Sequence, residues 1–158
     1  MLYFHVMKKI MYPLIALLVI AADQITKYLV RANMKPGERI PLIGDWLSLY
    51  YVRNTGTAFS MFEGNRYVTV LLTSVLIIVC LTVIVTEARA RRTLVPVLLT
   101  LVAAGGLSNL ADRLTLGYVT DMISCGSFAV FNVADIAVTC GCVLTMATLL
   151  LFYREEED

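Results

Sequence analysis

The stretch YVTVLLTSVLIIVCLTVIVT, from Tyr67 to Thr86, contains 20 residues and no charged side chain. An α-helix rises about 1.5 Å per residue, so about 20 residues cross a bilayer core that is about 30 Å thick. Three further stretches resemble it: a helical apolar pattern from Ile10 to about Val30, and uncharged runs from Leu94 to Leu110 and from Ile136 to Tyr153. The sequence therefore predicts an integral membrane protein with four transmembrane helices.

The composition agrees with a membrane protein. Of 158 residues, 59% are hydrophobic and only 16% are charged, whereas soluble domains carry about a quarter charged residues. The formal net charge is +1, so no basic surface indicates a nucleic-acid partner. The four cysteines show neither metal-ligand spacing nor a disulfide pattern. We expect buried thiols and neither a metal ion nor a cofactor.

We expect one integral membrane domain over residues 1–158. Its expected parts are spans at 10–30, 67–86, 94–113 and 132–153, external loops at 31–66 and 114–131, and a cytoplasmic loop at 87–93. The first span has a basic start at Lys8 and Lys9, as a cleaved signal peptide has. No small-x-small cleavage site follows it cleanly, and the helical pattern continues through Asp23 to Lys27, so we favour a retained helix.

An even number of spans places both ends of the chain on the same side of the membrane. The short ends and the tight loop between spans two and three are basic, which by the positive-inside rule predicts that they face the cytoplasm. Their basic residues are Lys8, Lys9, Arg89, Arg91, Arg92 and Arg154. The long loop from Arg31 to Arg66 also holds five basic residues against three acidic ones, but the rule is counted over short loops near span ends.

Polar side chains gather in five clusters, and the parity of the spans places all five on the external side. The clusters are Asp23-Gln-Ile-Thr-Lys27, Asn54-Thr-Gly-Thr-Ala-Phe59, Asn109-Leu-Ala-Asp-Arg113, Gly117-Tyr-Val-Thr-Asp121 and Phe131-Asn-Val-Ala-Asp135. Polar groups next to hydrocarbon are costly, so their concentration at one surface indicates a functional site. Nearby, the β-branched and aromatic residues from Asp45 to Asn54 predict a short strand or hairpin.

Two of the acidic residues have a cation close in sequence. Lys27 lies one helical turn after Asp23, and Arg113 follows Asp112 and can also reach Asn109. Each carboxylate has two readings, as half of a structural ion pair or as support for a site. We leave both readings open.

Asp121 and Asp135 differ, because neither has a basic residue within four positions. Such a carboxylate near the membrane takes up a proton or shares one with another carboxylate. A pair that shares one proton is equipped for hydrolysis, with the carboxylate activating water and the acid polarising a carbonyl. The alternative is a shared proton that only joins span four to its loop.

Several neutral residues can support that pair. Asn132 lies on the same helical face as Asp135, at i and i+3. Asn54 and Asn132 are candidates for orienting the aspartates or for hydrogen-bonding a substrate backbone, and Gly56 suits a turn. Gly105 and Gly106 allow a close approach in span three, for which helix packing is the favoured use.

The five clusters, with the third extended to Gly105-Gly-Leu-Ser-Asn-Leu-Ala-Asp-Arg113, resemble in order the motifs of the lipoprotein signal peptidases, also called signal peptidase II. They cover the chain from the first span to the fourth. The resemblance implies an all-α membrane protein with four transmembrane helices and a small external β-sheet, or cradle, formed mainly by the first external loop. One departure is Met122, which follows Asp121 where an aromatic residue is common.

The resemblance also implies an aspartic endopeptidase of the bacterial plasma (inner) membrane, with both termini cytoplasmic and its active site at the outer face. Its substrate is a diacylglyceryl prolipoprotein, cut before the lipidated cysteine. Membrane lipid and globomycin-type inhibitors are its other expected partners, and no oligomer is required. Asp121 and Asp135 correspond to the catalytic dyad. Positions of substrate contact or site support are Asp23, Lys27, Asn54, Gly56, Asn109, Asp112, Arg113, Asn132 and Ala134.

Two rival functions make different predictions. A transporter or proton-linked channel would place ionisable groups at several depths of the membrane, and the central and cytoplasmic halves of the spans have none. An assembly protein that binds helices through Gly105 and Gly106 would tolerate Asp121→Asn and Asp135→Asn.

Overall fold

The computed structural model describes residues 2–56, 66–89 and 94–152. In chain order its elements are α1 (Leu2–Asn33), β1 (Arg39–Ile43), β2 (Leu47–Asn54), α2 (Arg66–Arg89), α3 (Leu94–Thr115), β3 (Val119–Cys125) and α4 (Val133–Phe152). Within these described ranges, four helices are long and apolar enough to cross a membrane, and the strands form one antiparallel sheet. The predicted fold class is therefore confirmed. The basic residues Arg91, Arg92 and Arg154, the second cluster from 57 to 59, and the side chains of Lys8, Lys9 and Arg89 lie outside the described part.

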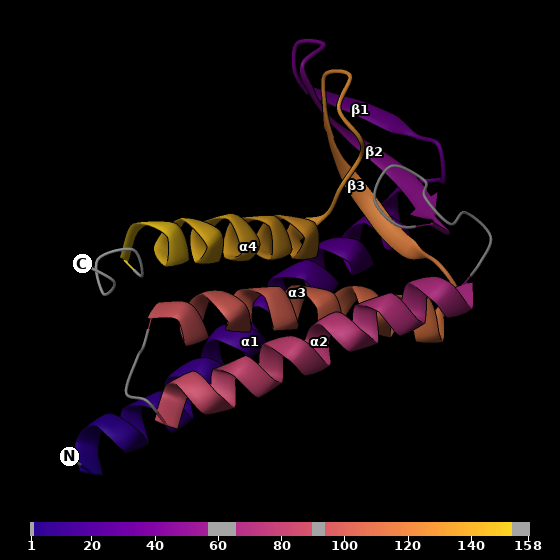
Figure 1. Cartoon of the computed structure of the whole chain (residues 1–158). Coiled ribbons are helices and arrows are strands. Elements are labelled where there is room, and N and C mark those ends of the chain that lie inside the picture. Colours follow the sequence, from indigo (N-terminus) through magenta and orange to yellow (C-terminus); the bar gives the residue numbers. More distant parts are fainter. Residues whose placement is uncertain (1, 57–65, 90–93, 153–158) are drawn as a thin grey trace.

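Helix α3 lies at the centre of the bundle, in contact with α1, α2 and α4 (Figure 1). The outer faces of the other three helices carry large exposed apolar side chains, among them Leu17, Leu18, Leu71, Ile78, Val143 and Leu150. Lipid chains are as apolar as these side chains, so such a surface is suited to a bilayer. The start of α1 and the end of α4 lie at one end of the bundle, and the sheet lies at the other (Figure 1).

Glycines allow α3 and α4 to approach closely. A Cβ added to Gly105 would lie 2.5 Å from the carbonyl oxygen of Ala134, and one added to Gly141 would lie 2.7 Å from the carbonyl oxygen of Leu98. Gly106 faces α2, where its added Cβ would lie 3.2 Å from Ile77. The expectation that Gly105 and Gly106 serve helix packing is confirmed. The contact of Gly105 also sets the position of the first turns of α4, where Asp135 lies.

The sheet has the order β1-β2-β3. The short strand expected between Asp45 and Asn54 is β2, its hairpin partner β1 lies before that range and was not predicted, and β3 comes from the connection between α3 and α4. Asp121 lies on β3 opposite Val52; the sequence had indicated only a connection there. Met122 is buried in a small core that joins the sheet to the end of α1, with Val30, Met34 and Tyr51. The position that departs from the family pattern is therefore a packing position.

Candidate functional site

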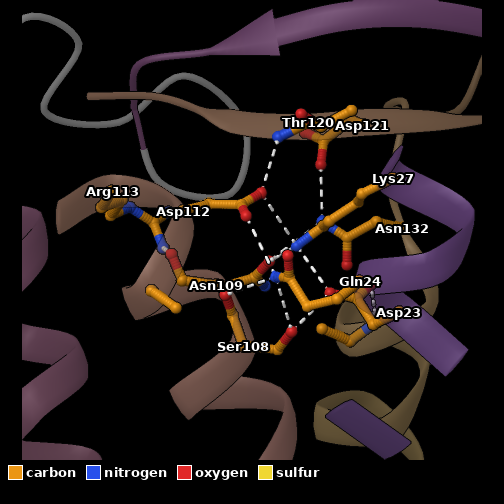
Figure 2. A network of polar contacts seen from close by, with 12 residues as sticks. Asp23, Gln24, Lys27, Ser108, Asn109, Asp112, Arg113, Thr120, Asp121 and Asn132 are labelled. Atoms are coloured by element: carbon orange, nitrogen blue, oxygen red, sulfur yellow. Dashed lines mark hydrogen bonds and ion pairs between the residues drawn. The ribbon is translucent and has the colours of Figure 1, made fainter. Parts of the chain in front are cut away.

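The polar clusters converge where α1, α3 and α4 meet β3 (Figure 2). Every site residue predicted from the sequence joins one network of hydrogen bonds and ion pairs there. Its members are Asp23, Lys27, Asn54, Gly56, Asn109, Asp112, Arg113, Asp121, Asn132, Ala134 and Asp135. The parity argument that placed the clusters at one surface is thus matched by direct contacts among them.

Lys27 is the centre of one part of the network. Its fully buried ammonium lies 2.7 Å from Asp23 and 3.2 Å from Asp112, and it donates a hydrogen bond of 2.7 Å to the amide oxygen of Asn109. The predicted pair of Asp23 and Lys27 is therefore confirmed. Two carboxylates, one cation and an amide satisfy one another here, as buried charges require.

Of the two readings left open for Asp112, the ion pair is present, but its cation is not the neighbouring Arg113. Adjacent residues on a helix do not face each other, so the cation closest to Asp112 is Lys27 from α1, with Arg31 at 3.9 Å. Arg113 instead donates to the carbonyl oxygens of Gly56, at 3.1 Å, and Asn109, at 3.4 Å. Arg113 thus holds the turn that follows β2 against α3.

Four network members were not among the predicted site residues: Gln24, Arg31, Ser108 and Thr120. The Gln24 amide donates to the Ser108 hydroxyl (3.0 Å) and to Asp112 (3.0 Å), while Ser108 donates to Asp23 (2.7 Å). The backbone N–H of Thr120 donates to Asp112 at 3.2 Å, which ties β3 to α3. Gln24 and Ser108 belong to the quoted motifs. Because polar residues within apolar spans indicate a site, both could have been predicted.

The first turn of α4 is held by two separate devices. Asn132 accepts from the backbone N–H of Asp135 (2.9 Å), and Asp135 accepts from the backbone N–H of Asn132 (3.1 Å). This reciprocal arrangement is a capping box, with Asn and Asp in place of the usual Ser and Glu. From α1, Asp23 accepts a third bond from the backbone N–H of Ala134, at 2.9 Å. Helix α4 therefore begins at a position that α1 helps to determine.

Amides, not cations, hold the two aspartates that were predicted to be catalytic. Asp121 accepts from the side-chain amides of Asn54 (2.9 Å) and Asn132 (2.7 Å). Asp135 accepts from the Asn109 amide, at 2.8 Å, as well as from the backbone of Asn132. Within the described residues, neither carboxyl group has a salt bridge, and no hydrogen bond joins them directly. Asn132 contacts Asp121 through its side-chain amide and Asp135 through its backbone N–H. The pair is therefore bridged by one residue and not by the directly shared proton that the sequence suggested.

The electrostatic environment favours a proton on this pair. Burial, followed by the negative charge of Asp135, raises the pKa of Asp121 from 3.8 to about 7, although the two amide bonds and Lys27 act to lower that pKa. The network holds four aspartates, Asp23, Asp112, Asp121 and Asp135, and three cations, Lys27, Arg31 and Arg113. One added proton brings these formal charges into balance. Half-buried Asp135 and buried Asp121 can thus supply one acid and one base.

A family model described as signal peptidase (SPase) II matches residues 15–151. The chain is 41% identical to the lipoprotein signal peptidase of Shouchella clausii, over 91% of this chain and 95% of that protein. It is 39% identical to the lipoprotein signal peptidase of Moorella thermoacetica, over 87% and 91% of the two chains.

Solved structures agree with the sequence comparisons. A bacterial membrane enzyme determined by the in meso method at 2.3 Å resolution matches with a TM-score of 0.84 and 30% identity, over 89% of this chain and 87% of that one. A second bacterial membrane enzyme, at 1.9 Å resolution, matches with a TM-score of 0.80 and 30% identity, over 90% and 94%. With four membrane-crossing helices and a family match over most of its length, this chain is a multi-pass membrane peptidase that belongs to the signal peptidase II family.

Proposed function

We propose that this protein is an aspartic endopeptidase that removes signal peptides from diacylglyceryl-modified bacterial prolipoproteins, cutting on the N-terminal side of the lipidated cysteine. The names of its relatives support the substrate class. The observation that carries the mechanism is the pair of Asp121 and Asp135, bridged by Asn132 and without a salt bridge among the described residues. Asp121, with a pKa of about 7, is poised to exchange a proton at neutral pH.

The pair would act as one acid and one base. The ionised carboxyl group takes a proton from water while the water oxygen attacks the scissile carbonyl carbon, and the protonated carboxyl group polarises the carbonyl oxygen. A proton then passes to the leaving nitrogen as the C–N bond breaks. The products are a signal peptide with a new carboxylate and a lipidated cysteine with a free amino group. The two carboxyl groups titrate as a coupled pair, so we assign the proton to the pair.

The remaining residues would position this pair. Asn54, Asn109 and Asn132 fix the carboxyl oxygens by amide hydrogen bonds. The elements that carry the pair are held together by two contacts. One is the ion-paired group of Asp23, Lys27 and Asp112, and the other is the bond from the backbone N–H of Ala134 to Asp23. Arg113 and Gly56 secure the turn after β2. Preorganised positioning of this kind keeps reacting groups aligned.

The location of the site suits a lipid-anchored substrate. The network lies at the sheet end of the bundle (Figures 1 and 2), where a diacylglyceryl group in one leaflet would bring its cysteine to the dyad. We propose the bacterial plasma (inner) membrane, with both termini cytoplasmic and the site at the outer face. Globomycin-type inhibitors would occupy the same site, and one copy of the chain supplies both aspartates, so no oligomer is needed.

The test is cleavage of purified prolipoprotein with and without the diacylglyceryl group. We expect the wild-type protein to cut only the modified form. Asp121→Asn and Asp135→Asn should each lower turnover by about 10² to 10⁴-fold, because each removes an acid–base group, while helical circular dichroism is unchanged. Asp45→Asn, in the exposed turn between β1 and β2, is the matched control and should keep full activity.

Two outcomes would contradict the proposal. Absence of cleavage of the modified substrate by folded wild-type protein would remove the assigned activity. Full turnover by folded Asp121→Asn and Asp135→Asn would remove the dyad and favour the assembly protein that the sequence left as a rival.

A further inference from the structure

A patch of exposed apolar side chains lies on the sheet, outside the helices. Among the described residues, the exposed large apolar side chains that lie outside helices are Ile40, Leu42, Ile43, Trp46, Leu116 and Phe128. All except Leu116 belong to β1, the turn after it, or the segment that follows β3. Trp46 and Phe128 are 64% and 61% exposed. Contiguous exposed apolar surface of this kind usually marks an interaction site.

Backbone hydrogen bonds join the two loop ends into one unit. The N–H of Gly126 donates to the carbonyl oxygen of Trp46 at 2.6 Å, and Leu47 pairs with Cys125 in the sheet. The Phe128 ring packs edge-on against Phe131, with ring centroids 6.1 Å apart. We call Ile40, Leu42, Ile43, Trp46 and Phe128 the sheet tip. The two loops that carry the tip are therefore held side by side.

The direction of the sheet indicates what covers the tip. In Figure 1 the strands run across the direction of the helices. The turn between β1 and β2 and the loop after β3 lie together at the upper end of the sheet, above the start of α4. Since the helices cross the bilayer, the sheet lies along the membrane surface with its tip over lipid beside α4. Tryptophan is enriched at this depth of a membrane. Among the described strands, β1 lies at an edge of the sheet and carries three large apolar residues, a combination that would be an aggregation hazard in water.

Charged residues at the sheet tip are consistent with a lipid headgroup region. Arg39 of β1 is exposed and stacks 4.7 Å above the Tyr50 ring, from which it can reach a lipid phosphate. Asp45, in the turn next to Trp46, is also exposed. We propose that the sheet tip inserts into the headgroup boundary of the phospholipid leaflet on the sheet's side of the membrane.

This contact goes beyond cleavage and gives the sheet a second attachment. One end of β3 is tied to α3 by the bond from Thr120 to Asp112, and the other end would be held in lipid through the tip. Asp121 lies on this strand between the two attachments. The tip would therefore limit the motion of β3 relative to the membrane surface.

The single tryptophan of the chain, Trp46, provides the test. The full chain is placed, one copy per disc, in nanodiscs of phosphatidylcholine and phosphatidylglycerol, with or without bromine on the acyl chains. We expect brominated lipid to quench Trp46, the emission to be blue-shifted from that of tryptophan in water, and acrylamide in the aqueous phase to quench weakly. A double variant serves as the reference for a tryptophan in lipid. It combines Trp46→Phe with Leu144→Trp, which places the tryptophan on the exposed face of α4.

Two variants separate the loss of insertion from any general effect of adding a carboxylate. Phe128→Asp should reduce bromine quenching of Trp46 and shift its emission to the red, because an added carboxylate opposes burial of the tip in lipid. Leu116→Asp changes an exposed leucine away from the tip and should leave both readings unchanged. Emission like that of tryptophan in water would overturn the proposal. Shielding from acrylamide without bromine quenching would also overturn it, since protein and not lipid would then cover the tip.

Discussion

The polar network has two halves, and aspartate side chains have different roles in them. In the ion-paired half, Asp23 and Asp112 both contact the Lys27 ammonium. In the amide-held half, Asp121 and Asp135 are fixed by asparagine amides and a backbone N–H. A cation neutralises a carboxylate and keeps it ionised, whereas an amide fixes its position and leaves it able to bind a proton. The difference separates residues that build the site from those equipped to react.

Removing the shared cation should produce the largest change in stability. Lys27→Met would leave Asp23 and Asp112 as buried charges without their closest partner and should lower the free energy of unfolding by about 3–5 kcal/mol. Thermal unfolding in detergent micelles, followed by circular dichroism, measures the loss. Lys35→Met is the control, since Lys35 is exposed and a surface substitution changes stability by about 0.5 kcal/mol or less. Equal effects of the two substitutions would show that Lys27 does not organise this half.

In the amide-held half, Asp121 should make the free energy of unfolding depend on pH. Asp121 has a pKa of about 7 in the folded protein, against 3.8 ordinarily, so the folded state binds more protons between these values. Its contribution to the free energy of unfolding is full below about pH 4 and falls as pH rises toward 7, by at most about 1.4 kcal/mol per pH unit. Denaturant titrations at several pH values should show this fall in wild type and a weaker one in Asp121→Asn. A parallel pH dependence in both would show that folding does not raise the pKa of Asp121.

Asn132 connects the two aspartates and caps α4, so its removal should affect both stability and turnover. Asn132→Ala loses the cap, worth about 1 kcal/mol, and removes the side-chain amide that holds Asp121, while the backbone N–H that holds Asp135 remains. We expect a lower kcat and a shifted pH–rate profile, because the carboxyl groups would no longer be held at their relative position. Asn33→Ala, at the exposed end of α1, should change neither. A loss of stability with an unchanged pH–rate profile would make Asn132 a structural cap only.

The smallest effect should come from Ser108, which only assists the ion-paired half. Ser108→Ala removes the hydrogen bond to Asp23 while Lys27 remains in place, so the expected loss is about 1 kcal/mol. Thr82→Ala, which removes an exposed hydroxyl that bonds within α2, is the comparison. A loss as large as that of Lys27→Met would mean that the hydroxyl, and not the ammonium, holds Asp23.

Much of the fold followed from local patterns in the sequence. Uncharged runs predicted the helices, and the aromatic and β-branched residues after Asp45 predicted the strand β2 but not its partner β1. The i and i+4 spacing of Asp23 and Lys27 predicted their ion pair. In contrast, β3 was missed, because its strand pairing depends on β2, which lies more than 60 positions earlier. The Asn132 to Asp135 capping box was visible as a pattern, but only its helical spacing was used.

By itself, the sequence determined the helix count, the family and the gathering of five polar clusters at one surface, because hydrophobic length, motif order and the parity of spans are one-dimensional properties. Only the tertiary structure decided which charge neutralises which carboxylate. Lys27 reaches Asp112, and Asp23 caps α4, across contacts between helices that are far apart in the chain. Electrostatic partners are chosen by distance in space, and packing of α1, α3 and α4 sets those distances.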